Sequence, residues 1–266
     1  MELDGASQRQ VELPSVFDTP MRADVVKRAF WLVRSHGLQP AGRDPMAGER
    51  TTAETHSPPT GTGQSRIPRV KGERYSRSGL AGGVASVVKG RLAHPPRSEK
   101  VLHLKINKKE RHLATASAIA FTSDSAAVQA RGHRLKKVEL PLVVADDVEK
   151  LTKTSEFVSF LEKVGLGDEV ARLYSGVRRN SGMGRLRGRA YREAVGPLIV
   201  VTKDRGLARA AAAVPGVGVQ DVDDLNILEL APGGVPGRLT IWTESSLAAI
   251  SKSDQKKVEV AAPSAA

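Results

Sequence analysis

Two stretches of helical periodicity flank a long segment that has no period at all. In the first stretch, apolar side chains recur at helical spacing at Met21, Val25, Ala29 and Leu32. Thr19 and Pro20 are typical of the cap and first turn of a helix, and Gly37 is a natural stop. The period returns after Asn107, which with Glu110 resembles a capping box. Both stretches therefore predict amphipathic helices that need a sheet or another helix to cover them.

Three short apolar runs in the second half of the chain predict buried strands at residues 140–145, 198–202 and 217–222. Helices are predicted around them at residues 157–164, 168–177 and 206–213. Alternating strands and helices imply a parallel sheet with right-handed crossovers. The predicted fold class is α/β, a parallel-sheet, Rossmann-like α/β sandwich with a long extended internal loop and a C-terminal extension.

The predicted domain organisation has three parts. Residues 1–41 and 101–231 should form the α/β globular domain, and residues 42–100 an extended basic loop inserted into it. Residues 232–266 should form a C-terminal extension outside the core, with a possible strand at 238–243, a short helix at 245–250 and a disordered end.

The inserted segment is too rich in glycine and proline to sustain a helix or a strand. A loop of about 60 residues far exceeds the usual ceiling of about 12 to 15 residues in a compact domain. Ordering it costs about 1 to 2 kcal/mol per residue, more than its few apolar side chains can offset. A dense set of contacts with a partner would have to hold it; the alternative is a solvated, disordered basic loop.

Charge narrows the choice of partner. Lys and Arg outnumber Asp and Glu by 41 to 29, which gives a net charge of +12 and favours a polyanion. Aromatic residues make up only 4%, so base stacking is poorly supplied and phosphates are the expected contact. With no cysteine, no apolar run long enough for a membrane span and no signal peptide at residues 1–10, we expect a cytosolic protein without membrane contact.

Basic side chains gather in two places. The inserted loop spreads its cations along the chain: Arg43, Arg50, Arg66, Arg69, Lys71, Arg74, Arg77, Lys89, Arg91, Arg97 and Lys100. A second cluster has no carboxylate among residues 170–192: Arg172, Arg178, Arg179, Arg185, Arg187, Arg189 and Arg192. Guanidinium groups take phosphates in bidentate pairs, so both clusters predict RNA-binding surfaces. The alternative for the second cluster is an exposed loop screened by water.

No motif points to catalysis. Gly182–Gly184 and Gly61–Gly63 lack the third glycine and the strand context of a dinucleotide fingerprint. The six histidines are scattered, and Asp146 with Asp147 suits helix capping as well as chemistry. We therefore expect no metal, no cofactor and no enzymatic activity.

Several stretches, in this order along the chain, resemble one known family. They are VELPSVFDTPMRADVVKRA (11–29), RDPMAGERTTAETHSPPTGTGQSRIPRVKG (43–72), KGRLAHPPRSEKVLHLKINKKERHLATASAIA (89–120), RGHRL (131–135), LIVVTKDRGLARAAAAVPGV (198–217) and PGRLTIWTESSL (236–247). The chain resembles the large-subunit ribosomal protein L-four family in its archaeal and eukaryotic form. The resemblance spans almost the whole chain.

The resemblance implies a structural constituent of the cytoplasmic large ribosomal subunit that binds its rRNA early in assembly. It implies that the loop tip helps to form the wall of the polypeptide exit tunnel and meets the nascent peptide, with Gly63, Gln64, Arg66, Arg69, Lys71 and Arg74 as tip residues. Outside the two clusters it adds rRNA contacts at His94, Lys105, Lys108, Lys109 and Lys203. Gln64 departs from the arginine common at its position, which leaves open which side chain lines the tunnel.

The expected partners are large-subunit rRNA and neighbouring ribosomal proteins, with no membrane and no second copy of the chain. The competing hypothesis is an RNA-modifying α/β enzyme that grips its substrate with the basic loop. A pocket for a nucleotide cofactor would distinguish the two.

Overall fold

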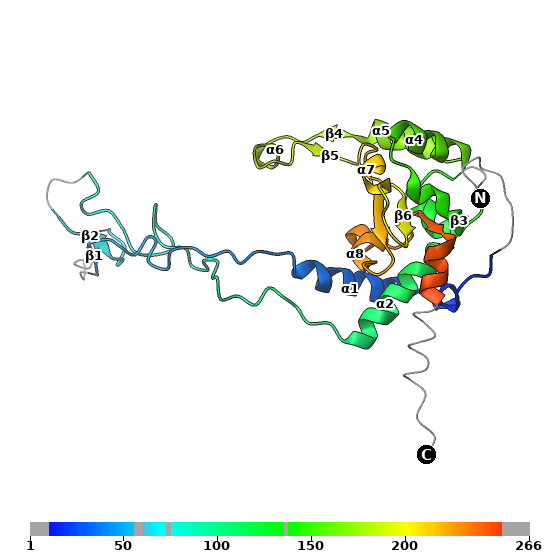
Figure 1. Cartoon of the computed structure of the whole chain (residues 1–266). Helices are drawn as coiled ribbons and strands as arrows, with labels where there is room; N and C mark the ends of the chain where they lie inside the picture. The colour runs from blue at the N-terminus through cyan, green and yellow to red at the C-terminus, as the bar shows by residue number, and fades with distance from the viewer. Residues whose placement is uncertain (1–10, 56–60, 62, 73–75, 136–137, 252–266) are drawn as a thin grey trace, which may run out of the picture. The chain divides into compact units, whose positions relative to one another are not determined.

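The computed structural model describes residues 11–55, 61, 63–72, 76–135 and 138–251 (Figure 1). It divides the chain into two compact units. One, here called the α/β unit, runs up to His36 and resumes at Leu104. The other, the insertion unit, comprises Gly37–His103. The two units are described separately below. The predicted disordered end, residues 257–266, lies outside the described residues.

A parallel four-stranded sheet forms the centre of the α/β unit. Its strands are β3 (Leu142–Val144), β8 (Thr240–Thr243), β6 (Leu198–Val201) and β7 (Gly218–Asp221), adjacent in that order. Ile241 of β8 is the register partner of Leu142 on one side and of Ile199 on the other. The parallel α/β fold class is therefore confirmed.

The position of β8 corrects one prediction. Residues beyond Pro232 were expected to extend outside the core, but β8 is an inner strand and all four of its residues are buried. The same segment continues into a helix at residues 244–251, where Leu247 and Ile250 are buried. An apolar run shows that a strand is buried but not which strands it joins, so its place in the sheet came only from the tertiary structure.

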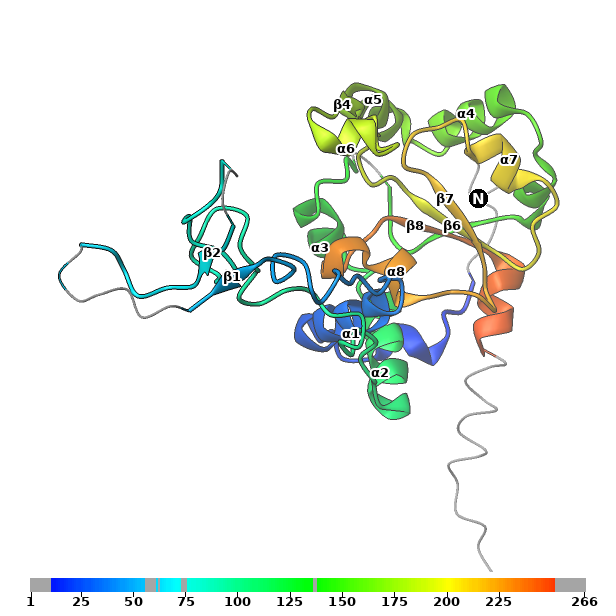
Figure 2. The ribbon, with the colours of Figure 1, turned by 90° about the vertical axis from the view of Figure 1, so that its left-hand side faces the viewer.

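Helices cover both faces of the sheet (Figure 2). On one face α4 (Thr154–Lys163), α5 (Gly167–Gly176) and α7 (Leu207–Ala211) pack in a cluster that includes Ile199 and Val201. On the other face α1 (Ala23–Ser35), α2 (Lys108–Ala120) and α8 (Ile227–Leu230) pack with Leu198, Val200 and Trp242. Successive residues of a strand point to opposite faces, so a sheet covered on both sides needs a continuous apolar run such as LIVV.

The starts of two helices differ from the sequence prediction. Helix α1 begins at Ala23 rather than at Thr19, which follows a short 3-10 turn, η1 (Ser15–Asp18). Its entry is fixed from another helix, because Arg22 N–H donates to Ser117 Oγ at 2.7 Å and that hydroxyl donates to Pro20 O at 3.0 Å. Helix α2 does begin after Asn107, but without a side-chain cap.

Short elements complete the α/β unit. Asp124 caps α3 (Ser125–Ala130) by accepting a hydrogen bond from the backbone N–H of Ala126. Two 3-10 turns, η2 (Asp146–Lys150) and η3 (Pro232–Gly234), follow β3 and α8. A hairpin between α5 and β6 contains β4 (Arg178–Arg179), α6 (Met183–Leu186) and β5 (Tyr191–Arg192).

Arg238 joins the amino ends of two strands to α8. Its side chain is almost fully buried and donates from Nε to Gly196 O at 2.9 Å and from Nη2 to Gly216 O at 3.3 Å. Its Nη1 donates to the backbone and carboxylate oxygens of Glu229 at 2.8 and 3.1 Å. This arginine, in the PGRLTIWT stretch, is thus a structural residue with no charge available to a partner.

Arg238→Met should lower the free energy of unfolding by about 3 kcal/mol, since it removes the almost fully buried donor to the carbonyl oxygens of Gly196 and Glu229. Urea unfolding of the full chain followed by circular dichroism measures the change. The control is Arg209→Met, an exposed arginine of α7 that should change stability by less than about 0.5 kcal/mol. Equal effects of both variants would contradict the structural role of Arg238.

Candidate nucleic-acid interface

A stiff hairpin projects from the α/β unit between α5 and β6 (Figure 1). We call residues 177–195 the arginine arm. Strands β4 and β5 pair antiparallel, and Gly182 and Gly188, both with positive φ, flank the short helix α6 at its end. Asn180 closes the hairpin: its N–H donates to Ala190 O at 2.9 Å and its Nδ2 to Arg189 O at 2.9 Å. The arm therefore has a defined backbone shape of its own.

The arm carries a dense positive charge, with six arginines against one carboxylate, Glu193, near its end. There is no carboxylate between Val177 and Arg192. The arginines of this segment are all exposed and form no ion pair within the described residues: Arg178, Arg179, Arg185, Arg187, Arg189 and Arg192. Like charges held this close repel, so the arm gains stability when a polyanion neutralises it.

Arg172, predicted as part of this cluster, has a different role. It lies on α5 and donates from Nη2 to Glu169 Oε1 at 2.5 Å and to Val195 O at 2.7 Å. Its charge is already paired, and its second bond holds the returning strand of the arm. Glu169 lies one residue before the stretch 170–192, which has no carboxylate. The three-residue spacing on one helix was the signal that could have found the pair.

Glu169 is the centre of a buried polar network at the root of the arm. His133 of the RGHRL stretch lies with Nδ1 at 2.6 Å from Glu169 Oε1, and both side chains are almost fully buried. The backbone N–H of Arg134 donates to Glu169 Oε2 at 2.9 Å. Burial alone would raise the pKa of Glu169, but hydrogen bonds from Arg172, His133 and Arg134 outweigh it and lower the pKa to about 2.

The insertion unit has no apolar core. Among its described residues only Gly82 is buried, beside the side chains of Ala53 and Val70. Its regular structure is one pair of short antiparallel strands, β1 (Ala53–Glu54) and β2 (Arg69–Val70). Main-chain hydrogen bonds such as Gly82 N–H to Pro68 O, at 3.0 Å, provide the remaining cohesion. The prediction that this segment lacks a core of its own therefore agrees with the burial of its described residues.

Four of the predicted cations in the insertion unit already have partners inside it. Arg69 is half-buried and donates from Nη1 to Gly79 O at 2.9 Å and from Nη2 to Ser65 O at 3.3 Å. Arg50 pairs with Asp44 at 2.9 Å, Arg91 lies 3.7 Å from Glu49, and Lys71 pairs with Glu54. These side chains therefore stabilise the fold of the unit, and their charge is at least partly neutralised before any ligand binds.

Other predicted basic residues of the chain are exposed and have no ion pair within the described residues: Arg43, Arg66, Arg77, Lys89, Arg97, Lys100, Lys105, Lys108, Lys109 and Lys203. His94, Gly63 and Gln64 are exposed as well. Arg74 lies outside the described residues. The predicted site residues therefore fall into two groups. Some are exposed cations without an ion pair among the described residues, and others are cations whose hydrogen bonds or ion pairs stabilise the fold.

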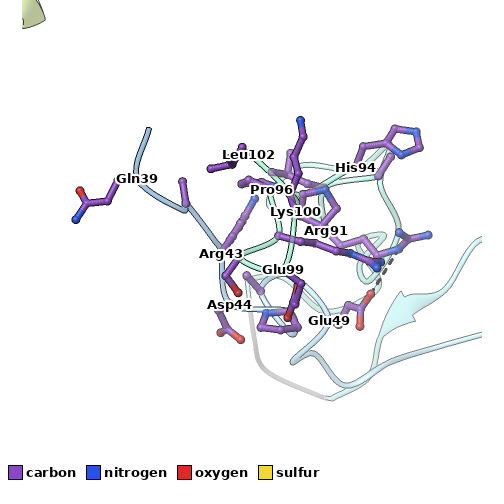
Figure 3. Close-up of a pocket in the computed structure, with 18 of the residues that line it drawn as sticks. Gln39, Arg43, Asp44, Glu49, Arg91, His94, Pro96, Glu99, Lys100 and Leu102 are labelled. Atoms are coloured by element: carbon purple, nitrogen blue, oxygen red, sulfur yellow. Dashed lines mark ion pairs between the residues drawn. The ribbon is translucent and has the colours of Figure 1, made fainter. Parts of the chain in front are cut away.

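Two segments of the insertion unit, residues 38–49 and 91–102, enclose an open hollow of about 1450 Å³ (Figure 3). Arg43, Lys100 and His94 are among its lining residues, together with the Arg91–Glu49 pair. The two segments are joined by a hydrogen bond that Arg43 N–H donates to Pro96 O at 3.2 Å. The lining has both signs of charge, so the hollow is not by itself a selective anion site.

At the edge of the sheet where α/β enzymes bind ligands, hydrogen bonds within the protein bridge the ends of β3, β6 and β8. At the carboxyl ends of the strands, Glu149 Oε1 accepts from Thr202 N–H at 3.1 Å and Asp146 Oδ1 accepts from Ser245 N–H at 3.0 Å. Thr202 Oγ1 donates to Ser245 Oγ at 2.7 Å. The carboxylates of Glu149 and Asp146 therefore hold the backbone together at this part of the edge.

The described residues contain neither a cluster of metal ligands nor a membrane-spanning helix. No three His, Asp or Glu side chains come together there in a way that could hold a metal ion. None of the helices in that part of the chain is both long and apolar enough to cross a membrane.

Fold and site together define a basic α/β protein whose open functional groups are cations on two extended segments. Comparison with known proteins identifies the class more closely. The family model of the ribosomal protein L4/L1 family matches residues 11–253. The chain belongs to this family, as its sequence resemblance predicted.

Curated relatives support the assignment. The large ribosomal subunit protein uL4 of Saccharolobus islandicus (strain M.14.25 / Kamchatka #1) is 43% identical over 249 residues, covering 93% of this chain and 91% of the relative. Its counterparts in Saccharolobus solfataricus and Methanosphaera stadtmanae are also 43% identical, over 97% and 92% of this chain and 95% and 92% of their own lengths. The family consists of structural ribosomal proteins, which confirms the prediction of a protein without enzymatic activity.

Glu169 makes the stability of the α/β unit depend on pH. A carboxyl whose folded-state pKa is depressed stabilises the fold above its unfolded pKa of about 4.5, and this stabilisation is lost as the pH falls toward 2. The shift corresponds to about 3 kcal/mol. Glu169→Gln should therefore be less stable by about that amount at pH 7 and should lose less stability than wild type between pH 4.5 and 2.

Urea unfolding at a series of pH values measures both effects. The control variant Glu162→Gln changes an exposed carboxyl on the neighbouring helix α4 and should follow the wild-type pH profile. Parallel profiles for wild type and Glu169→Gln would show that Glu169 does not carry this pH dependence.

Proposed function

We propose that the chain is a structural constituent of the large ribosomal subunit that binds large-subunit rRNA through the insertion unit and the arginine arm. One observation carries the proposal: both segments expose arginine and lysine side chains that have no carboxylate partner within the described residues. The curated relatives are named as large ribosomal subunit proteins, which places the chain in the cytoplasmic ribosome with rRNA and other ribosomal proteins as partners.

The lack of an apolar core in the insertion unit supports a role that depends on RNA. A segment of this length loses about 1 to 2 kcal/mol of conformational free energy per ordered residue, and only Gly82 is buried among the described residues of the unit. Charge-assisted hydrogen bonds to phosphate are about twice as strong as neutral ones. A series of such contacts along the outgoing and returning segments of the insertion unit would hold it in one shape.

A finer part of the proposal concerns the tip of the insertion unit. Gly63, Gln64, Arg66, Arg69, Lys71 and Arg74 form the segment that would contribute to the wall of the polypeptide exit tunnel, close to the nascent peptide. Gln64 and Arg66 are exposed, whereas Arg69 donates to two backbone carbonyls. Arg66 is therefore the better candidate for direct contact, and Arg69 for keeping the tip in shape. Binding early in assembly follows, since rRNA must be able to fold around this segment.

The competing hypothesis of an RNA-modifying enzyme has no observation in its favour. The family is structural, and two carboxylates near the strand ends, Glu149 and Asp146, are engaged in hydrogen bonds to the backbone.

Binding of the full chain to deproteinised large-subunit rRNA should weaken steeply as salt increases. Each phosphate that is neutralised contributes about 0.7 to 0.9 to the slope of log affinity against log salt concentration. Substituting Arg185 and Arg187 together by glutamine should lower that slope by about 2. The matched control is Arg34→Gln with Arg209→Gln, two exposed arginines away from the arm. A slope unaffected by the arm variant would remove the arm from the interface.

The insertion unit should be cut by trypsin faster than the α/β unit in the free protein, because no apolar core protects it. Large-subunit rRNA should protect residues 42–100, which is followed by mass spectrometry of the fragments. A large excess of an unrelated duplex RNA of equal length serves as the control for non-specific charge. Equal cleavage with and without rRNA would count against ordering by RNA.

A further inference from the structure

One exposed aromatic side chain lies within the arginine arm. Among the described Phe, Tyr and Trp residues only Trp31, Tyr174 and Tyr191 are exposed. Tyr191 belongs to β5, and 61% of its surface is accessible. Most of the surface of this ring is therefore open to a ligand, on a segment otherwise rich in exposed arginine.

The strand register places Tyr191 beside an arginine. Arg179 of β4 is its direct partner across the hairpin, while Arg178 stands opposite Arg192. Side chains of directly opposite residues lie on the same face of a two-stranded ribbon, and those of the next pair lie on the other face. One face of the arm therefore presents a phenol ring together with a guanidinium group, and the other presents two guanidinium groups.

The backbone under this pair is fixed. Asn180 Nδ2 donates to the carbonyl oxygens of Arg189 and Tyr191, at 2.9 and 3.3 Å, so the strand that carries the tyrosine is bonded on both sides of Ala190. Arg172 holds Val195 O at the root of the arm. A ring on a prearranged strand loses little freedom when a ligand stacks on it.

We propose that the Arg179–Tyr191 face binds an unpaired nucleotide of RNA, with the base stacked on Tyr191 and its phosphate paired with Arg179. This rests on the proposed function and deepens it, because phosphate contacts alone need no aromatic group. A base within a duplex has both of its faces covered by neighbouring bases, so a ring can stack only on a base in a loop, bulge or strand end. Six arginines without a carboxylate between Val177 and Arg192 favour RNA over a protein partner.

The test compares four variants of the full chain bound to deproteinised large-subunit rRNA at several salt concentrations. Tyr191→Ala should weaken binding about tenfold or more without changing the salt slope, since stacking releases no counterions. Tyr191→Phe keeps the ring and should bind like wild type. Arg179→Gln should lower the slope by about 1. Tyr174→Ala removes an equally exposed tyrosine on α5, outside the arm, and should have no effect.

The outcomes separate this inference from the proposed function. If Arg179→Gln lowers the slope while Tyr191→Ala binds like wild type, the arm contacts phosphate only and the stacking proposal is wrong. If Tyr191→Phe is as weak as Tyr191→Ala, the hydroxyl matters rather than the ring, which also overturns it. Absence of rRNA binding by wild type would instead defeat the proposed function itself.

A photocrosslinking residue at position 191 gives an independent readout in assembled subunits. Crosslinks to a nucleotide that is unpaired in the rRNA are expected. Crosslinks to a base-paired segment, or to a ribosomal protein, would overturn the assignment. Because Tyr191 is exposed, circular dichroism of each variant should match wild type, so a lost contact is not confused with a lost fold.

Discussion

The pairing of β8 with two neighbours holds the α/β unit together. This strand comes last in the chain, yet it lies between β3 and β6 and joins them through parallel hydrogen bonds. Its Trp242 packs edge-on against Phe17, from the other end of the described chain, with ring centres 5.8 Å apart. Because β3 pairs with no other described strand, β8 is what joins it to β6 and β7 in one sheet.

Arginine side chains have two different roles in this protein: some stabilise the fold, and others are exposed on the arm. Arg238 and Arg172 are largely buried, bonded to backbone carbonyls and to a carboxylate, and they fix where strands begin and where the arm returns. The arginines of the arm itself have no such partners within the described residues. A guanidinium group has five N–H donors in a planar fork, which suits it equally to internal carbonyl oxygens and to external phosphates. Its surroundings decide between folding and binding.

The candidate site could be predicted only in outline. Charge and glycine content located both basic segments, because such composition excludes a packed core. They could not separate Arg69, which bonds to Ser65 O and Gly79 O, from Arg66, which is open. Nor could they show that Tyr191 shares a face with Arg179, since strand register fixes that pairing. A low aromatic content pointed away from base stacking, although a single well-placed ring can provide it.

The sequence by itself determined the α/β class, the buried strands and the places where positive charge accumulates, because period, apolar runs and charge are local properties. The tertiary structure alone decided that β8 is an inner strand, that Ser117 rather than Thr19 fixes the entry to α1, and that Glu169 takes up the charge of Arg172. Each of these depends on a partner's position in space. Hydrogen bonds and ion pairs act only at short range, so that position, rather than residue type, selects the partner.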